Sequence, residues 1–387
     1  MTTTTDPEVR AEIVATVRRF VERDVAPVAS ALEHADEYPA ALVTTMRDLG
    51  LFGVTIAPEH GGLGLDLLTY AAIIEELAAG WMSLTGILNT HVMVANLIAA
   101  SGTDDQARRW LPQLASGEVR GALSLSEPDA GSDTGALSCR AERDGDEYVI
   151  TGTKMWVTNG ARAGLVALAA RTEEGITCFL VGKEPGERCG GITVSRNIGK
   201  LGYKGIETVE MVYDAHRVPA DAVLGGEAGL GHGRHFILAA LEVGRINIAA
   251  RAVGVARAAF EASLRYAQQR ETFGVPIAQH QAIQLKLADM ATKLEAARLL
   301  TRSAAERRQA GERCDVEAGM AKLFASEAAL EIATDAMRIH GGVGYTTELP
   351  VERYYRDAPL MIIGEGTNEI QRLVIARGLL ARHRIDP

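Results

Sequence analysis

Residues 364–372 contain a carboxylate in unusual surroundings: Glu365 stands between two glycines, directly before Thr367. Apolar residues then recur at helical spacing from Ile370 to Leu380, so Thr367 is predicted to cap a helix. The two glycines allow the backbone to bend and another molecule to approach the carboxylate closely. A helix cap requires only the threonine, so Glu365 is a candidate for acid–base chemistry. A solvated loop glutamate is the alternative that this segment alone leaves open.

Two further segments could hold a flat heteroaromatic ring. Residues 123–133 supply hydroxyls, backbone N–H groups and glycine, which could surround such a ring and its phosphate tail. Residues 154–160 add Trp156 and Thr158, an indole and a hydroxyl able to flank and hydrogen-bond the ring. A structural interpretation stays open for each segment: a turn-rich loop for the first and a core tryptophan for the second.

Two helix ends carry groups suited to phosphate and adenine. In residues 270–277, Arg270 and Phe273 lie at a turn between helices, where they suit a pyrophosphate and an adenine ring. Gly341 and Gly342 end a helix and expose backbone N–H groups for a second phosphate contact, although a simple C-cap explains the same glycines. No GxGxxG follows a predicted strand, so a nicotinamide-binding Rossmann unit is not supported.

Helices are expected to dominate the first block, residues 1–118. Thr103 and Gln106 form a capping-box pattern, and residues 84–100 form a nearly apolar helix that implies burial on several faces. This block is predicted to be an N-terminal helical domain.

The residue pattern changes in residues 119–226, where short runs of alternating apolar and polar residues are separated by turn signals such as Asn159-Gly160. This pattern predicts a small middle β barrel. Residues 227–387 return to long helical patterns, with Asp315 available as a cap, and predict a C-terminal helical bundle.

The bulk composition restricts the function classes. The chain has 387 residues, 47% hydrophobic and 23% charged, which is an ordinary soluble composition with room for two or three domains. A net charge of −10 argues against nucleic-acid binding. The cysteines lack CxxC spacing, so neither a disulfide framework nor a metal site is expected. Residues 1–10 are polar, and no uninterrupted apolar run reaches ~18 residues, so a cytoplasmic protein without a membrane span is expected.

Taken together, five segments resemble the acyl-CoA dehydrogenase family, and its short- and branched-chain members in particular. They follow the family order: Ser126-Glu127-Pro128-Asp129-Ala130-Gly131-Ser132-Asp133, Lys154-Met155-Trp156-Val157-Thr158-Asn159-Gly160, Arg270-x-x-Phe273-Gly274-x-Pro276-Ile277, His340-Gly341-Gly342 and Glu365-Gly366-Thr367. The resemblance implies an α+β fold with an N-terminal helical domain, a middle β barrel and a C-terminal four-helix bundle. It also implies non-covalent FAD and a homotetramer built from dimers.

The resemblance assigns roles to individual positions. The isoalloxazine would be lined by Leu123, Leu125, Ser126, Gly131, Ser132, Trp156 and Thr158. The AMP half of an FAD held by a neighbouring subunit would be contacted by Arg270, Phe273, Gln281, Arg338, Gly341, Gly342, Thr367 and Glu369. Arg338 departs from the glutamine common at its position, so only backbone contacts are expected there. The substrate would be contacted by Ser132, Glu242, Arg245 and Gly366.

By the same resemblance Glu365 removes the α-proton of an acyl-CoA while the β-hydrogen leaves as hydride to the flavin, which gives a trans-2-enoyl thioester. Expulsion of water raises the pKa of Glu365, and the nearby helix N-terminus acts in the opposite direction. The backbone N–H of Glu365 and a flavin ribityl hydroxyl would hold the thioester carbonyl. Two family variants place the base at the position of Gly244, where glycine cannot serve, so Glu365 is the only matched base.

Substrate choice rests on single positions. Gly364 replaces a tyrosine common in relatives, which predicts room for a branched or bulkier acyl group. Met82 stands where glutaryl-specific members carry arginine, so a decarboxylating glutaryl-CoA activity is not expected. The far end of the acyl pocket has four candidates, for which core packing is the other interpretation: Trp81, Leu84, Ile87 and Leu88.

Several alternatives remain open from the sequence. Electron transfer flavoprotein is the acceptor that the resemblance implies, but an oxidase of the same fold would pass electrons to oxygen. The acyl group could also be bound to a carrier protein in place of CoA. Glu365 argues against a flavin monooxygenase of the same architecture. A non-catalytic helical scaffold is the remote alternative.

Overall fold

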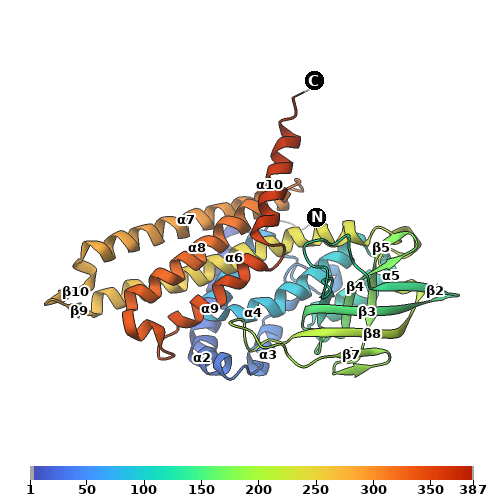
Figure 1. Cartoon of the computed structure of the whole chain (residues 1–387), viewed down its shortest axis with the longest axis horizontal. Coiled ribbons are helices and arrows are strands. Elements are labelled where there is room, and N and C mark those ends of the chain that lie inside the picture. Colours follow the sequence, from blue (N-terminus) through green and yellow to red (C-terminus); the bar gives the residue numbers. More distant parts are fainter. Residues whose placement is uncertain (1–3, 386–387) are drawn as a thin grey trace.

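The computed structural model describes residues 4–385 and places helices, a sheet and further helices in chain order (Figure 1). Residues 1–3, part of the polar stretch noted in the sequence, lie outside the described residues. The first helices are α1 (Pro7–Phe20), α2 (Ala26–His34), α3 (Ala40–Asp48), α4 (Leu67–Ser101) and α5 (Asp104–Ala115), with a π-helical turn Val21–Val25 between α1 and α2. The predicted capping box of α5 is confirmed, because Thr103 and Gln106 each bond the backbone of the other.

α4 is longer than the apolar helix predicted at 84–100, and it contains a kink at Trp81, whose φ of −159° and ψ of 109° are not helical. By length and composition alone α4 could cross a membrane. However, 83% of its most apolar window is buried inside the protein, as is typical of a core helix.

The middle of the chain forms one eight-stranded sheet with the path β1-β4-β2-β3-β8-β7-β6, and β5 pairs with β4. The strands are β1 (Gly121–Ser124), β2 (Arg140–Asp144), β3 (Glu147–Thr158), β4 (Leu165–Thr172), β5 (Gly175–Gly182), β6 (Arg188–Cys189), β7 (Ile192–Val194) and β8 (Thr208–Pro219). Alternate residues of β4 enter two different hydrophobic clusters, one on each face of the sheet. Since both faces are covered, β4 reads as a continuous apolar run.

The C-terminal helices pack as a bundle built on α6, whose main partners are α4 and α8. They are α6 (Gly233–Gln269), α7 (Gln281–Gln309), α8 (Asp315–His340), α9 (Val351–Ile363) and α10 (Asn368–Arg382), with a small hairpin of β9 (Glu271–Thr272) and β10 (Val275–Pro276) between α6 and α7. The prediction that Asp315 caps α8 is wrong: Asp315 is the first helical residue, and Cys314 holds the cap position without a side-chain bond. The predicted cap of α10 is confirmed, because Thr367 accepts from the backbone of Ile370.

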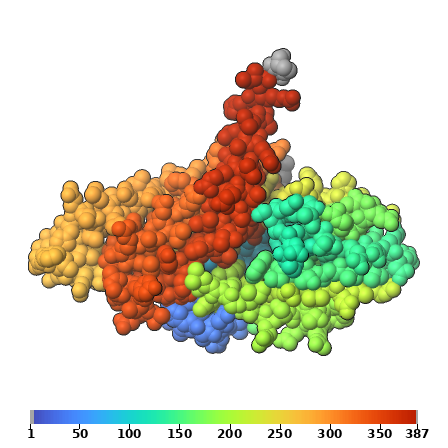
Figure 2. Space-filling view, in the orientation of Figure 1, coloured from blue at the N-terminus to red at the C-terminus, as the bar shows by residue number. Residues whose placement is uncertain are grey.

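The α+β fold predicted from the sequence is thus confirmed, with the middle sheet as a half-barrel. In Figure 1 the β9–β10 hairpin lies at the left end of the molecule and the sheet at the right end, with the bundle between them. The space-filling view shows α10 projecting from the body of the molecule (Figure 2).

Candidate active site

Glu365 lies in the short connection between α9 and α10, and its backbone is strained. Its φ is +55°, a left-handed conformation that a residue with a side chain seldom adopts, and the following Gly366 has a φ of +83°. Thr367 caps α10, which begins at Asn368, so the connection between the two helices is limited to the four residues 364–367. Such strain persists only where surrounding contacts hold the backbone in place.

A buried lysine on α8 supplies those contacts. Lys322 is fully buried, and its Nζ donates to the carbonyls of Ile362 at 3.0 Å and Gly366 at 2.9 Å and to Asn368 Oδ1 at 2.7 Å. These acceptors lie on both sides of Glu365, so a single ammonium group ties the whole connection to α8. Burial lowers the pKa of Lys322 to about 8.

The carboxylate of Glu365 points between α4 and α6. Asn89 Nδ2 on α4 donates to Oε1 at 2.9 Å, while Oε2 is buried without a hydrogen-bond partner among the described residues. A Cβ added to Gly244 on α6 would lie 2.8 Å from Oε2. Burial raises the pKa of Glu365, although the positive charge of Arg251 and the bond from Asn89 act in the opposite direction.

A buried polar cluster adjoins this carboxylate. Asn247 Nδ2 donates to the Tyr70 hydroxyl at 2.8 Å, and Arg251 donates to Asn247 Oδ1 at 2.8 Å. The Arg251 guanidinium also lies 5.5 Å from the ring centroid of Tyr203. Tyr203 packs so closely on α4 that a Cβ at Gly86 would lie 1.5 Å from its hydroxyl.

The two segments predicted to surround a heteroaromatic ring are brought together. Met155 N donates to the Ser126 carbonyl at 2.8 Å, and Lys154 pairs with Glu127 at 2.8 Å with both side chains buried. Glu127 also accepts from Ser138 and Cys139, which fixes the loop 126–139 from beneath. A buried pair with this many hydrogen bonds leaves few polar atoms unsatisfied.

Trp156 is not a core tryptophan, the alternative considered from the sequence. It occupies an irregular point of β3 where the register with β8 shifts, has a φ of +61° and is 59% exposed. Thr158, two residues further along β3, is half-buried, as are Leu123, Leu125 and Ser126 of the other segment, whereas Gly131 and Ser132 are exposed. An exposed indole on a strained backbone is a ready platform for a flat ring.

The residues assigned to the AMP half of the cofactor lie elsewhere. Arg270, Phe273 and Gln281 are exposed on or next to the β9–β10 hairpin, and Phe273 is 97% exposed. The C-terminal end of α8 lies at the same end of the bundle, because the ring of His340 on α8 stacks on that of Tyr266 near the end of α6, with 4.3 Å between the ring centroids. Arg338, Gly341 and Gly342 are therefore at this same end, which Figure 1 places far from the sheet. Glu369 is exposed on the first turn of α10, beside Thr367.

Of the residues assigned to the substrate, Gly366 directly follows Glu365, Ser132 is exposed in the loop 126–139, and Glu242 and Arg245 lie on α6. Arg245 directly follows Gly244, is buried, and has its pKa lowered by burial. Glu242 is half-buried and lies 3.6 Å from Arg308. The four residues suggested for the far end of the pocket, Trp81, Leu84, Ile87 and Leu88, are all buried in the main hydrophobic core, where packing accounts for them.

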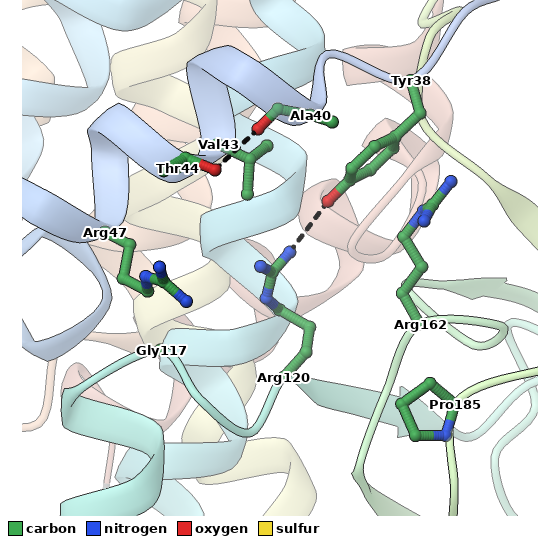
Figure 3. A pocket seen from close by; sticks show the side chains of 9 residues that line it. All are labelled: Tyr38, Ala40, Val43, Thr44, Arg47, Gly117, Arg120, Arg162 and Pro185. Carbon is green, nitrogen blue, oxygen red and sulfur yellow. Dashed lines mark hydrogen bonds between the residues drawn. The ribbon is translucent and has the colours of Figure 1, made fainter.

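An open hollow of about 310 Å³ lies apart from these residues (Figure 3). Arg47 on α3, Arg120 and Arg162 line it together with Tyr38, whose hydroxyl accepts from Arg120 at 3.1 Å. No carboxylate lines it and none of the predicted site residues does. Elsewhere Glu33, His34 and Glu352 are close enough to hold a cation, but Arg356 pairs with both carboxylates.

Reasoning from the sequence missed several residues of the site. Lys322 stands in the alanine-rich stripe of α8, where a charged residue on a buried face is a detectable signal. Asn247 and Arg251 interrupt the apolar face of α6 in the same way. Asn89 carries no comparable signal, because its partner lies 276 positions away.

The chain is ordered as helices, sheet and helices, and a carboxylate with one buried, unpaired oxygen lies between α4 and α6. Three family models match the chain in the same order: the acyl-CoA dehydrogenase N-terminal domain at residues 7–118, the middle domain at 122–216 and the C-terminal domain at 231–380. An acyl-CoA dehydrogenase of Bacillus subtilis is 43% identical over 94% of this chain and 96% of its own length. The mitochondrial short-chain specific acyl-CoA dehydrogenase of Bos taurus is 41% identical over 98% of this chain and 92% of its own length.

Solved structures agree. Butyryl-CoA dehydrogenase from Megasphaera elsdenii has a TM-score of 0.92 and 34% identity, and covers 98% of this chain and 100% of its own. A structure from work on the electron transferring flavoprotein of Acidaminococcus fermentans has a TM-score of 0.92, 36% identity and the same coverage. A glutaryl-CoA dehydrogenase from Mycobacterium smegmatis in complex with FADH2 has a TM-score of 0.90 and 30% identity, with coverage of 99% and 97%. The chain belongs to the acyl-CoA dehydrogenase family.

The family is FAD-dependent, and the residues of this chain fit a flavin. Trp156 offers an exposed aromatic face, and added Cβ atoms at Gly131, Gly341 and Gly342 would meet nothing within 4 Å. The open space beside these glycines lets a ligand approach the backbone, as a phosphate or ring edge requires.

Proposed function

We propose that the protein dehydrogenates a short or branched acyl-CoA to the trans-2-enoyl-CoA with non-covalent FAD. The observation that carries the proposal is the position of Glu365, a carboxylate with one oxygen held by Asn89 and the other buried and unpaired. A carboxylate from which water is excluded is a stronger base than a free one, which the weakly acidic α-carbon of a thioester requires.

The chain supplies a donor as well as a base. The backbone N–H of Glu365 has no acceptor among the described residues, so it is available to a thioester carbonyl. A fixed donor of this kind stabilises the enolate-like charge that develops as the α-proton leaves. FAD, when bound, would supply the acceptor for the β-hydrogen. Lys322 keeps the donor and the base in one orientation by holding the connection around them.

The preference for a short or branched acyl group rests on Gly364. A Cβ there would meet only the Leu360 carbonyl, at 3.3 Å, so the missing side chain leaves space next to the base. The short-chain specific relative supports the same size class. Electron transfer flavoprotein is the acceptor we propose, on the family resemblance.

A homotetramer built from dimers is proposed for a structural reason. Trp156 lies on β3 of the sheet, whereas Phe273 lies on the β9–β10 hairpin, which Figure 1 places at the end of the bundle away from the sheet. This separation supports an FAD site that two subunits share. The hairpin of a second subunit would complete the flavin site next to Trp156, and this contact would cover the exposed ring of Phe273.

Stopped-flow bleaching of the flavin tests the proposed function. The FAD-loaded protein is mixed without oxygen with butyryl-, isobutyryl-, 2-methylbutyryl- and isovaleryl-CoA, and with a carrier-protein thioester. Rapid bleaching by a CoA ester is expected, and a clear preference for straight chains would refute the assignment from Gly364. Oxygen uptake during turnover would indicate an oxidase instead.

A further inference from the structure

Arg251 is a buried charge without a carboxylate partner. Its side chain is 2% exposed, and no carboxylate of the described residues lies within 4.0 Å of its guanidinium. Its side-chain partners are neutral, namely Asn247 Oδ1 and the Tyr203 hydroxyl, and its Nε is buried and unpaired. An isolated buried cation is unfavourable, so the position requires an explanation.

Other arginines of the helical core show what a structural role looks like. Arg257, two turns further along α6, pairs with Glu75 at 3.3 Å and Glu76 at 2.8 Å. Arg353 on α9 donates to the Gly80 carbonyl at 2.8 Å and to Ser30 at 3.1 Å, which ties three helices together. Arg251 makes no bond of this kind to another helix; its partner Asn247 is on its own helix.

The helix places Arg251 on the side of the base. Gly244, Asn247 and Arg251 are spaced by three and four residues and so share one face of α6. Side chains on a helix lean toward its N-terminus, so the guanidinium reaches back to Asn247, about one turn or ~5 Å from the level of Gly244 and Glu365. Among the charged groups around Glu365, Arg251 has the largest lowering effect on the pKa of the carboxylate.

The two ends of this face of α6 differ in their exposure to solvent. Glu242 and its neighbour Arg308 are partly exposed, whereas Tyr70 and Tyr203 next to Arg251 are buried. CoA needs the open end, so the acyl chain of a bound thioester points to the closed end, toward Arg251. The Tyr70 hydroxyl accepts from Asn247, and its own hydrogen has no acceptor among the described residues, so it is a second donor in this place.

We propose that Arg251 binds a carboxylate at the far end of the acyl chain, so that the substrate is the CoA monothioester of a four- or five-carbon dicarboxylic acid. The product keeps this carboxylate, in line with the absence of an arginine at Met82. This inference rests on the proposed function. The length follows from the one-turn separation, which a chain of two or three further carbons spans. A carboxylate there would pair the buried cation and accept from Arg251 and Tyr70.

Two measurements test it. The FAD-loaded protein is reduced with succinyl-, glutaryl- and butyryl-CoA, and the ratio of the dicarboxylic to the butyryl rate is compared between wild type and Arg251→Gln. The ratio should favour a dicarboxylic ester in wild type and fall on the order of 100-fold in the variant, with partial recovery in Arg251→Lys. Arg353→Gln, which removes an equally buried arginine outside the site, should leave the ratio unchanged.

Calorimetric binding of the same esters to FAD-loaded Glu365→Gln, with and without Arg251→Gln, gives a readout without turnover. The preference for a dicarboxylic ester should disappear with Arg251. A wild-type preference for butyryl-CoA, or an equal loss for all esters in the Arg251 variants, would overturn the inference and reduce Arg251 to a counter-ion of Glu365. If no ester bleaches the flavin, the proposed function fails, while the binding ratio still decides the role of Arg251.

Discussion

Gly244 and Glu365 face each other so closely that α6 has no room for a side chain at this point. An added Cβ would lie 2.8 Å from Glu365 Oε2 and 3.1 Å from Met93 Sδ. The family resemblance implies a base at one or the other of these positions. A side chain at position 244 would require the Glu365 carboxylate to move.

Gly244→Ala should therefore displace the carboxylate. Because a misplaced base is a poor catalyst, we expect flavin reduction to slow by roughly 10- to 100-fold, with little change in FAD content. Stopped-flow absorbance measures the rate. Gly182→Ala on β5 is the control, since its added Cβ would meet only the Trp110 ring, at 3.3 Å. An unimpaired Gly244→Ala enzyme would show that the carboxylate is not held where the structure places it.

Glu365→Gln removes the base and nearly preserves its shape. The amide can still contact Asn89, so the fold and the bound FAD should persist. Loss of a general base typically slows a reaction by about 10²- to 10⁴-fold, and that loss is expected in bleaching by any acyl-CoA. Wild-type bleaching by this variant would exclude Glu365 as the base.

The pH profile should report the environment of Glu365. Burial raises its pKa above the ordinary 4.5, and only the ionised form takes a proton, so the reduction rate should rise with pH around that raised pKa. The free energy of unfolding should change with pH in the opposite direction to the rate. The contribution of Glu365 to stability is fully present below its pKa in the unfolded chain, and it is lost as pH rises through its raised pKa in the folded protein, because folding disfavours the buried charge.

Asn89→Leu should move this acidic limb further upward, because the amide donates to the ionised carboxylate and lowers its pKa. Asn96→Leu, two turns further along α4, is the control and should leave the limb in place. A limb that does not respond to Asn89→Leu would contradict the hydrogen bond as a determinant of the pKa.

Lys322→Met should affect both stability and rate. The substitution removes three hydrogen bonds. The Ile362 carbonyl loses its donor, whereas the Gly366 carbonyl keeps Gln371 and Asn368 Oδ1 keeps Ser326, so we expect a loss of about 1–3 kcal/mol in the free energy of unfolding, measured in denaturant. Bleaching should slow as well, because the connection around Glu365 is released. Lys183→Met removes a buried amine that donates to the Ala163 carbonyl, and should lower stability without slowing bleaching.

Trp156→Ala and Phe273→Ala should weaken FAD binding. Both side chains are largely exposed, at 59% and 97%, so the unloaded protein should change in stability by no more than about 0.5 kcal/mol. Flavin absorbance per protein after gel filtration measures retention. Leu201→Ala, at a residue 63% exposed, is the control. Full retention in both variants would remove these rings from the cofactor site.

The sequence predicts features that depend on neighbouring residues. Thr367 caps α10 and Thr103 caps α5 because a cap is a contact within one turn, and the order of helices and sheet follows from periodicity. Asp315 shows the limit of such reasoning, since a boundary one residue away removes the cap.

Contacts between distant segments could not be predicted. Asn89 and Glu365 meet across 276 positions, and Lys322 reaches carbonyls 40 and 44 positions away. Neither residue type indicates its partner, because an asparagine or lysine has many polar groups available in the unfolded chain. The separation of the cofactor residues is different, because the family resemblance already implied that Arg270 and Phe273 contact an FAD held by a neighbouring subunit.

The contact between Tyr203 and Gly86 restricts how this site can evolve. An added methyl group at position 86 would overlap the phenol oxygen at 1.5 Å, so no other residue is tolerated while the tyrosine is present. Change at the two positions must follow an order, in which the tyrosine is lost first and the glycine is then free to vary. Descendants of this protein that carry a larger residue at 86 should all share a smaller one at 203.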